Sequence, residues 1–164
     1  SDDLTIDLVV LRNSVEDRLL ERERHGDPLV LFDRGLGIGS VPLHRDAHDA
    51  RLRGRYAEIV AASPILIPLV SKAIDRGFVA EAASSYQNFL LRPLIDLLRM
   101  EHCPERFDFG FRYLDRDLPP SERAFVEHLS ITGDLESIDE LRKQAVERFD
   151  MQILRVEALL NGEP

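Results

Sequence analysis

The distribution of hydrophobic residues changes along this chain, and the change limits the folds that it can adopt. Strand-like apolar runs occur only near the N-terminus, in residues 4–11 (LTIDLVVL) and 28–32 (PLVLF). From residue 52 onward, apolar residues recur every three or four positions, as in helices that pack on one side. Two strands alone are not stable in water, whereas the helical part is long enough to form its own core. We therefore expect an α+β chain that is mainly α.

The N-terminal region predicts a β-α-β unit. The first apolar run is nearly continuous, which favours a strand covered on both faces, and the charged residues 15–24 are typical of a short surface helix. The two strands of such a unit belong to one sheet. We expect a partial sheet over residues 1–35, with the rest of the sheet upstream of Ser1, a glycine-rich linker over 36–50 and a helical bundle over 51–164.

Prolines mark where the helices of the bundle are expected to begin, bend or end. The pair Ser63-Pro64 is typical of a helix start, and Pro93 should kink its helix or divide it in two. The long last helix should begin near Asp134. The helices are expected near residues 52–62, 64–76, 79–103, 121–129 and 134–160.

The charge and the cysteine content of the chain indicate which kinds of partner it can bind and in which cellular compartment it can fold. The 30 acidic and 21 basic residues give a net charge of −9, which disfavours binding to nucleic acid. The single cysteine, Cys103, excludes an internal disulfide framework and fits a reducing compartment. No apolar run is long enough to span a membrane, and no secretory signal is visible. We expect a soluble, cytoplasmic protein without nucleic-acid or membrane partners.

Asp7 is an isolated carboxylate within the first apolar run. A buried charge of this kind costs several kcal/mol unless it is paired or bound to a cation. One interpretation is an aspartate at a strand end that reaches solvent or caps the next helix. The other is a carboxylate at a sheet edge that acts as a metal ligand or as a general base.

The pattern around Asp7 resembles the second half of nucleotidyltransferases with the DNA polymerase β-like fold, and most closely the aminoglycoside adenylyltransferases. These proteins have a strand of the form IDL, a spacer, and a strand that ends in L-x-D-[KR]-[DG]. The matching residues are Ile6-Asp7-Leu8 and the sequence LFDRG at 31–35. Residues 77–119 also resemble the C-terminal part of uncharacterised bacterial nucleotidyltransferase-like proteins.

The resemblance implies transfer of AMP from Mg-ATP to a hydroxyl group of a small, aminoglycoside-like acceptor. In the family, a Gly-Ser turn holds the triphosphate, and a D-x-D pair with a third acidic residue binds two Mg²⁺ ions or supplies the base. Asp7 matches the third acidic position. Only SDDLTI precedes Asp7, and the dipeptide Gly39-Ser40 follows the strands instead of preceding them. We therefore expect this chain alone to be inactive, either as a fragment or as a degenerate relative.

The helical region supplies the residues expected to contact the acceptor. A row of cationic side chains follows one helix flank into an aromatic, charged loop over residues 104–120. The alternatives are a solvated helix flank and a loop fixed to the bundle by its aromatic residues. The candidate substrate-binding residues are Tyr86, Asn88, Arg92, Arg99, His102, Arg112 and Asp115.

Two further interpretations follow from the residues. His44 and His48 have the i, i+4 spacing of a zinc site if they are helical, and a solvated linker is the alternative. A rival to the transferase is a non-catalytic helical interaction module, in which the last helix pairs with a partner or with a second copy to form a homodimer.

Overall fold

A computed structural model gives the fold, and it describes residues 20–35, 37 and 39–162, together with residues 8, 10, 12 and 14. Asp7 and most of the first predicted strand therefore lie outside the described residues. The chain divides into two compact units, Ser1–Arg45 and Asp46–Pro164. This boundary falls within the segment that the sequence identifies as a linker.

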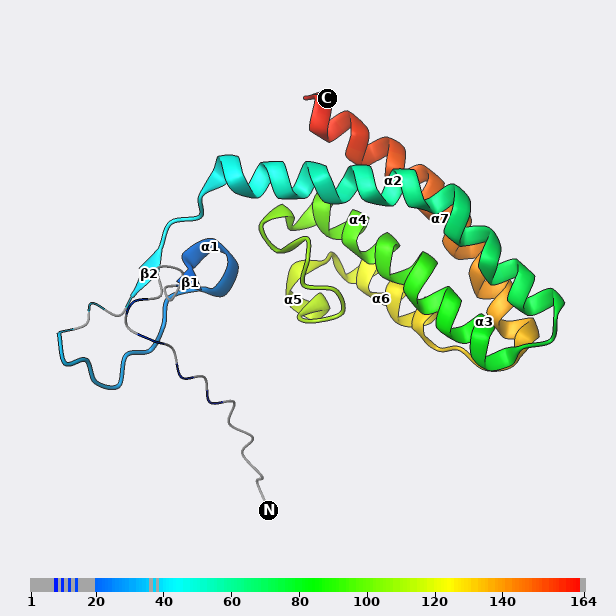
Figure 1. Ribbon diagram of the computed structural model, residues 1–164, viewed down its shortest axis with the longest axis horizontal. Helices are drawn as coiled ribbons and strands as arrows, with labels where there is room; N and C mark the ends of the chain where they lie inside the picture. The colour runs from blue at the N-terminus through cyan, green and yellow to red at the C-terminus, as the bar shows by residue number, and fades with distance from the viewer. Residues whose placement is uncertain are drawn as a thin grey trace, which may run out of the picture. The chain divides into compact units, whose positions relative to one another are not determined.

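The first unit contains a small parallel β-α-β arrangement. Strand β1 (Leu20–Glu21) leads into the single-turn helix α1 (Arg22–His25), and β2 (Ser40–Val41) pairs with β1 in parallel (Figure 1). The register places Leu20 opposite Ser40. The chain is thus mainly helical, with a small two-stranded parallel sheet near the N-terminus and a helical bundle after it, as the sequence predicts.

The positions of the predicted strands and helix in this unit are partly wrong. The predicted strand at 28–32 has no regular structure, and its side chains are exposed, with Leu29 at 88% and Phe32 at 76%. An apolar run becomes a strand only where neighbouring strands pair with it. A helix is predicted over residues 15–24. Of its C-terminal half, residues 20–21 form β1 and residues 22–24 belong to α1. Ser40 is held by a hydrogen bond from Arg22 Nε at 3.1 Å.

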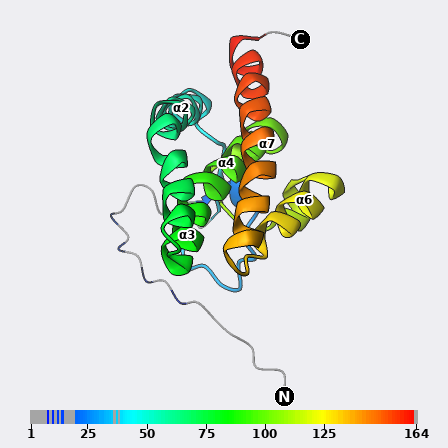
Figure 2. The ribbon, with the colours of Figure 1, turned by 90° about the vertical axis from the view of Figure 1, so that its right-hand side faces the viewer.

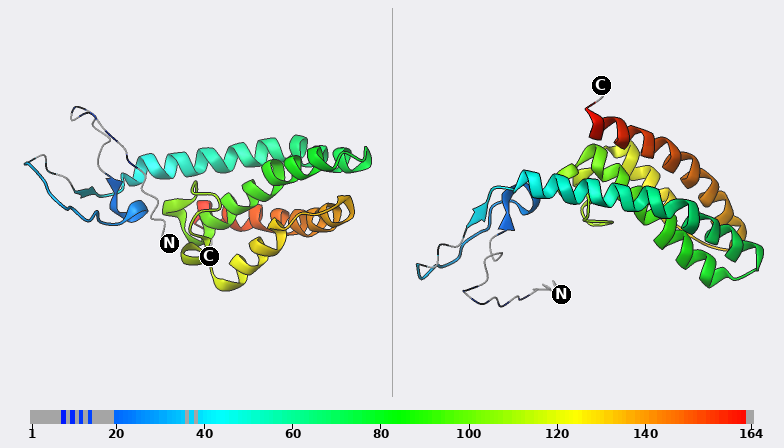
Figure 3. Two further views of the ribbon diagram at one scale, coloured as in Figure 1. Left: turned by 90° about the horizontal axis from the view of Figure 1, so that it is seen from below. Right: turned by 45° about the horizontal axis from the view of Figure 1, so that its top comes forward.

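The second unit is a bundle of helices around one core. Helices α2 and α6 lie on opposite sides of α4 and α7 (Figures 2 and 3). Its helices are α2 (Arg45–Asp75), α3 (Val79–Tyr86), a π-helical turn (Gln87–Leu91), α4 (Arg92–His102), a 3₁₀ turn (Pro104–Arg106), α5 (Leu114–Asp117), α6 (Pro120–Ser130) and α7 (Leu135–Asn161).

Helix α2 is continuous where the sequence predicts two helices, so the predicted start at Ser63-Pro64 is wrong. Pro64 and Pro68 both lie inside the helix. A proline lacks the N–H that would bond to the carbonyl four residues earlier, which for Pro64 is the carbonyl of Val60. The Ser63 hydroxyl donates to that carbonyl at 3.3 Å. Ser63 therefore replaces the missing donor and does not cap a new helix.

Where the sequence predicts a kink or a division at Pro93, the helix instead contains a π-helical turn. The backbone N–H of Arg92 donates to the carbonyl of Gln87, five residues earlier, which widens the helix immediately before the proline. This widening accommodates the proline ring, which would clash with the carbonyl of Phe89 in a regular helix. The α3–α4 helix therefore changes its geometry without breaking.

Helices α4 and α7 form the centre of the bundle. Every residue from Leu94 to Met100 is buried, so α4 is covered on all sides. Helix α7 contributes a buried stripe that includes Ile138, Ala145 and Phe149, close to the predicted one. The Asp134 side chain accepts a hydrogen bond from Ser137 N at 2.9 Å, so α7 begins with an N-cap where the sequence predicts its start.

Candidate functional site

A groove of about 290 Å³ lies between α2 and the π-helical turn. Arg55 and Ile59 line it from α2, Asn88 and Phe89 from the π-helical turn, and Phe149 from α7. The groove thus combines aromatic and aliphatic walls with a few polar groups, which is the usual composition of small-molecule sites. Because π-helical turns occur often at functional sites, this groove is the leading candidate site in the described part of the chain.

An ion pair fixes the polar end of the groove. Nε and Nη2 of Arg55 donate to the same oxygen of Asp96, at 3.0 and 2.8 Å. Asp96 is buried, whereas Arg55 is partly exposed and also pairs with Glu58 at 3.3 Å. Burial raises the pKa of Asp96, and the hydrogen bond and charge of Arg55 offset this only in part. A carboxyl group with a raised pKa beside a groove is a common feature of functional sites.

Asn88 is the one predicted acceptor-binding residue that lines this groove. It is exposed, and its amide nitrogen donates to the carbonyl of Ser84 at 2.8 Å. Arg92 follows the same turn and is exposed as well. Its guanidinium lies close to Gly110, since a Cβ added there would be 3.7 Å from Arg92 Nη2.

Two other predicted residues have structural contacts inside the bundle. Tyr86 is fully buried, and its hydroxyl donates to the carbonyl of Leu129 at 2.9 Å. Burial strongly raises the pKa of the Tyr86 hydroxyl, so it stays protonated. Arg99 is also fully buried, and it donates to backbone carbonyl groups of the loop that follows α4. Both side chains hold elements of the bundle together.

Arg99 and Asp117 form the centre of a buried charge cluster. Arg99 Nη1 donates to Asp117 Oδ2 at 2.8 Å, and both side chains are fully buried. Asp117 also pairs with Arg106 at 2.7 Å and with Arg116 at 3.1 Å. Burial acts to raise the pKa of Asp117, but hydrogen bonds from Arg99, Arg116 and Arg106 outweigh it and lower the pKa. The cluster fixes the aromatic loop against α4.

The remaining predicted residues lie apart from the groove. His102 is partly buried at the end of α4, and its Nε2 is 3.7 Å from Glu101. Arg112 and Asp115 are exposed in the loop, where only the backbone carbonyl of Arg112 contacts Arg99. The structure therefore places Asn88 in this groove and Arg92 beside Gly110 of the loop, and it distributes the other predicted residues over the core and the loop.

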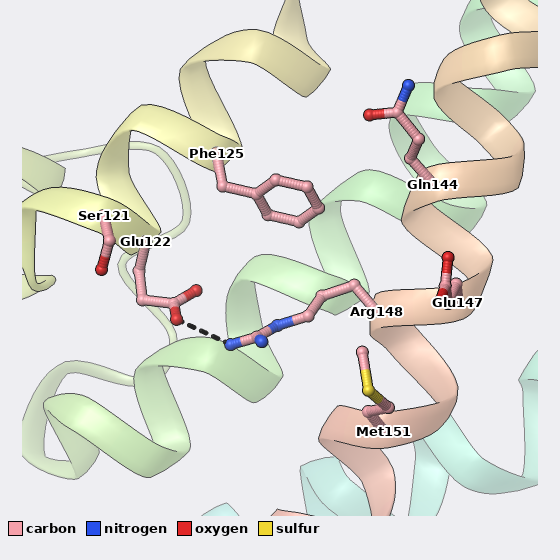
Figure 4. Close-up of a pocket in the computed structure, with 7 residues that line it drawn as sticks. All are labelled: Ser121, Glu122, Phe125, Gln144, Glu147, Arg148 and Met151. Carbon is pink, nitrogen blue, oxygen red and sulfur yellow. Dashed lines mark hydrogen bonds and ion pairs between the residues drawn. The ribbon is translucent and has the colours of Figure 1, made fainter.

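Two further grooves border α7. The first, of about 350 Å³, lies between α6 and α7 and contains Phe125, Met151 and the ion pair of Arg148 with Glu122 at 2.8 Å (Figure 4). The second, of about 300 Å³, is lined by Leu52 of α2 and by residues at the end of α7. Neither groove contains a predicted site residue.

The described residues contain no metal site. No group of three or more His, Cys, Asp or Glu residues among them lies close enough to hold a metal ion. His48 is buried, its Nε2 lies 2.9 Å from the carbonyl oxygen of Pro104, and its Nδ1 is 3.2 Å from Arg51. The predicted pair of His48 with His44 therefore forms no zinc site here.

Helix α2 is long and apolar enough to cross a membrane, with a mean hydropathy of 1.6 over its most apolar 18-residue window. Only 17% of that window is buried. Length and composition alone are weak grounds for a membrane span, although the core helices of soluble proteins that meet the same criteria are mostly buried, unlike this window. One face of α2 packs in the bundle, where Ile59, Val70 and Ala73 are buried.

Comparison of the chain with protein-family models, curated proteins and solved structures gave no match. Asp96 and Arg55 are the site residues that the sequence interpretation missed. Asp96 stands in the apolar run PLIDLLRM, which is itself a signal, because a charge in such a run needs a partner. Its partner is 41 residues earlier in the chain, so the pair has no local spacing pattern.

Proposed function

We propose that this chain is the C-terminal part of a nucleotidyltransferase-like protein that transfers AMP from Mg-ATP to a hydroxyl group of a small, aminoglycoside-like acceptor. The observation that carries the proposal is the order of the architecture, a short parallel β-α-β unit followed directly by a helical bundle. The resemblance of the sequence to adenylyltransferases implies this order, although the motif LFDRG at 31–35 lies between β1 and β2 in a segment without regular structure. The chain alone is expected to be inactive.

The proposal assigns the chemistry to Asp7, as general base or metal ligand. Asp7 lies outside the described residues, and the described residues hold no cluster of metal ligands. Mg²⁺ and ATP would therefore be bound by Asp7 together with acidic and Gly-Ser motifs supplied from elsewhere. In a complete protein, Mg²⁺ would neutralise the charge of the phosphate groups.

The acceptor is assigned to the groove beside the π-helical turn. Phe89, which is partly exposed, offers an apolar surface against which a sugar ring can pack, and Asn88 can form hydrogen bonds with hydroxyl or amino groups. Asp96 and Glu58 place two acidic groups at this part of the groove, beside the basic side chains of Arg55 and Arg92. A small polyhydroxylated amine fits this combination of surfaces and charges.

Titration calorimetry with kanamycin as the probe tests the assignment on the full chain. Asn88→Lys should weaken kanamycin binding and Asn88→Asp should strengthen it. One unit charge near a bound amine is worth about 1 kcal/mol, roughly fivefold in affinity. Asn161→Lys is the matched control, since Asn161 is exposed at the end of α7, away from the groove. Absence of binding, or equal effects of Asn88→Lys and Asn161→Lys, would refute the acceptor groove.

A non-catalytic helical interaction module is the second candidate. The observation that favours it is the structural use of Tyr86 and Arg99, which leaves few predicted residues to form a substrate cleft. Such a module should bind neither nucleotide nor kanamycin. Light scattering and calorimetry with kanamycin, performed on the full chain, separate the two candidates, because only the transferase half should bind kanamycin.

A further inference from the structure

The outer face of α2 is an apolar stripe that the bundle leaves exposed. No charged residue occurs between Glu58 and Lys72, and Ile65, at the centre of this segment, is 71% exposed. An isoleucine this exposed in the middle of a long helix is uncommon unless a partner covers it. The exposed stripe consists of Ala57, Ala61, Pro64, Ile65, Pro68 and Leu69.

The stripe lies opposite the face by which α2 packs in its own bundle. Ile59 and Val70 are buried on the inner face, and Tyr56 on that side donates to the carbonyl of Ile153 in α7 at 3.3 Å. No other described helix of the bundle covers the outer side of α2 (Figure 3). Helix α7, by contrast, buries its main apolar stripe within the bundle, and its exposed apolar residues are Met151, Leu154 and Leu159.

The charges that flank the stripe are arranged symmetrically. Glu58 and Lys72 lie equally far before and after Ile65, by about two helical turns, so all three share one face. Both flanking side chains are accessible, although Glu58 also pairs with Arg55 within its own helix. The face thus has an apolar centre with one acid and one base at its two ends.

This arrangement is complementary to itself in one orientation. If two α2 helices pack antiparallel about a twofold axis at Ile65, Glu58 of each copy faces Lys72 of the other. The same operation places Leu69 of one copy opposite Ala61 of the other, a large residue against a small one. A parallel pair would instead place glutamate against glutamate and lysine against lysine, which is unfavourable.

A membrane surface fits the stripe less well. Helices that lie on membranes combine their apolar face with several Lys or Arg residues, which anionic lipids attract. Here the two charges on the stripe cancel, and the whole chain carries a net charge of −9. We propose that the partner of this face is a second copy of the chain, bound through antiparallel pairing of α2 about Ile65. This inference does not depend on the proposed transferase function.

Sedimentation velocity on the full chain, at near-physiological salt and over a hundredfold range of concentration, measures the association. The wild type should show a monomer–dimer equilibrium. Ile65→Asp should weaken dimerisation at least tenfold, because it places two carboxylates at the twofold axis, whereas Ile131→Asp should not. Ile131 is the matched control, since it is 78% exposed and follows α6. Circular dichroism of each variant checks that the fold is retained.

A charge exchange tests the orientation. Glu58→Lys and Lys72→Glu should each weaken dimerisation, and the double variant should restore it, because the antiparallel pair regains both ion pairs. In addition, Ile65→Cys should form a disulfide-linked dimer on mild oxidation, whereas Ile131→Cys should not; the native Cys103 is buried.

Three results would overturn the proposal. The first is a monomer at every concentration. The second is a dimer that Ile65→Asp leaves unchanged, which would place the contact elsewhere. The third is a monomer that binds anionic lipid vesicles through the stripe, detected by co-sedimentation that Ile65→Asp abolishes, which would assign the face to a membrane.

Discussion

Asp117→Asn tests whether the buried charge cluster fixes the aromatic loop to the bundle. The substitution keeps the shape of the side chain but removes the negative charge that faces Arg99. Arg99 would then be a buried cation whose acceptors are all neutral, namely backbone carbonyl groups and the amide oxygen of the new side chain. Removing one partner of a buried ion pair usually costs about 3–5 kcal/mol, which is a large part of the stability of an ordinary domain.

Urea unfolding at pH 7, followed by circular dichroism, measures the loss of unfolding free energy. Asp115→Asn is the matched control, because Asp115 is exposed two residues earlier, and it should change stability by no more than about 0.5 kcal/mol. A loss of less than about 1 kcal/mol for Asp117→Asn would show that the cluster contributes little and that apolar packing holds the loop.

The pH dependence supplies a second test of the same cluster. The folded-state pKa of Asp117 is lowered, so its contribution to stability is fully present above its unfolded-state pKa of about 3.9 and is lost as the pH falls through the folded-state value. The stability difference between wild type and Asp117→Asn should therefore be constant near neutral pH and shrink below about pH 4. A difference that stays constant into strong acid would contradict this assignment.

Three further substitutions separate structural from functional roles. Tyr86→Phe should lower the unfolding free energy by about 1–2 kcal/mol in urea unfolding, because the carbonyl of Leu129 loses its donor, and should leave kanamycin binding unchanged. Asp96→Asn should lower the unfolding free energy less than Asp117→Asn does, because burial already raises the pKa of Asp96 and Arg55 is partly exposed. The stability of the wild type relative to Asp96→Asn should rise as the pH falls through the raised pKa toward the ordinary pKa of an aspartate. Asp7→Asn, in a complete transferase that contains this chain, should reduce turnover by about two or more orders of magnitude with little change in melting temperature.

Helical periodicity predicts most of the bundle, because the helices around α4 bury one side each, whereas α4 is covered on all sides. The stripe on α7 and the N-cap at Asp134 follow from local spacing, and both are present. The proline positions were harder to interpret. At Pro93, where the sequence predicts a kink or a division, the helix widens into a π-helical turn and continues. Pro64 does not interrupt α2, since the Ser63 hydroxyl supplies a donor to the carbonyl that the proline leaves unbonded. Whether a proline interrupts a helix therefore depends on whether a neighbouring side chain can replace the missing donor.

The sequence predicts that a β-α-β unit is present, but it does not predict which residues form its strands. A parallel β-α-β unit is present, but the apolar run 28–32 remains exposed and β2 forms at Ser40–Val41. Pairing decides where a strand forms, and the partners of an apolar run cannot be read from the run itself. The candidate site has the same difficulty, because Arg55 and Asp96 meet from distant parts of the chain.

Asp96 provides a guide to the interpretation of Asp7. Both are single carboxylates in apolar runs, IDLVVL and PLIDLLRM, so burial of either run imposes the same demand for a compensating charge. For Asp96 that charge is Arg55, which comes from another helix of the same unit. If Asp7 is buried in a sheet, it needs a compensating cation as well. That cation is either a basic side chain, as for Asp96, or a bound metal ion. Isothermal titration of Mg²⁺ into a nucleotidyltransferase that contains this chain, compared with its Asp7→Asn variant, tests the metal: loss of Mg²⁺ affinity in the variant supports a metal ligand, and unchanged affinity refutes that role.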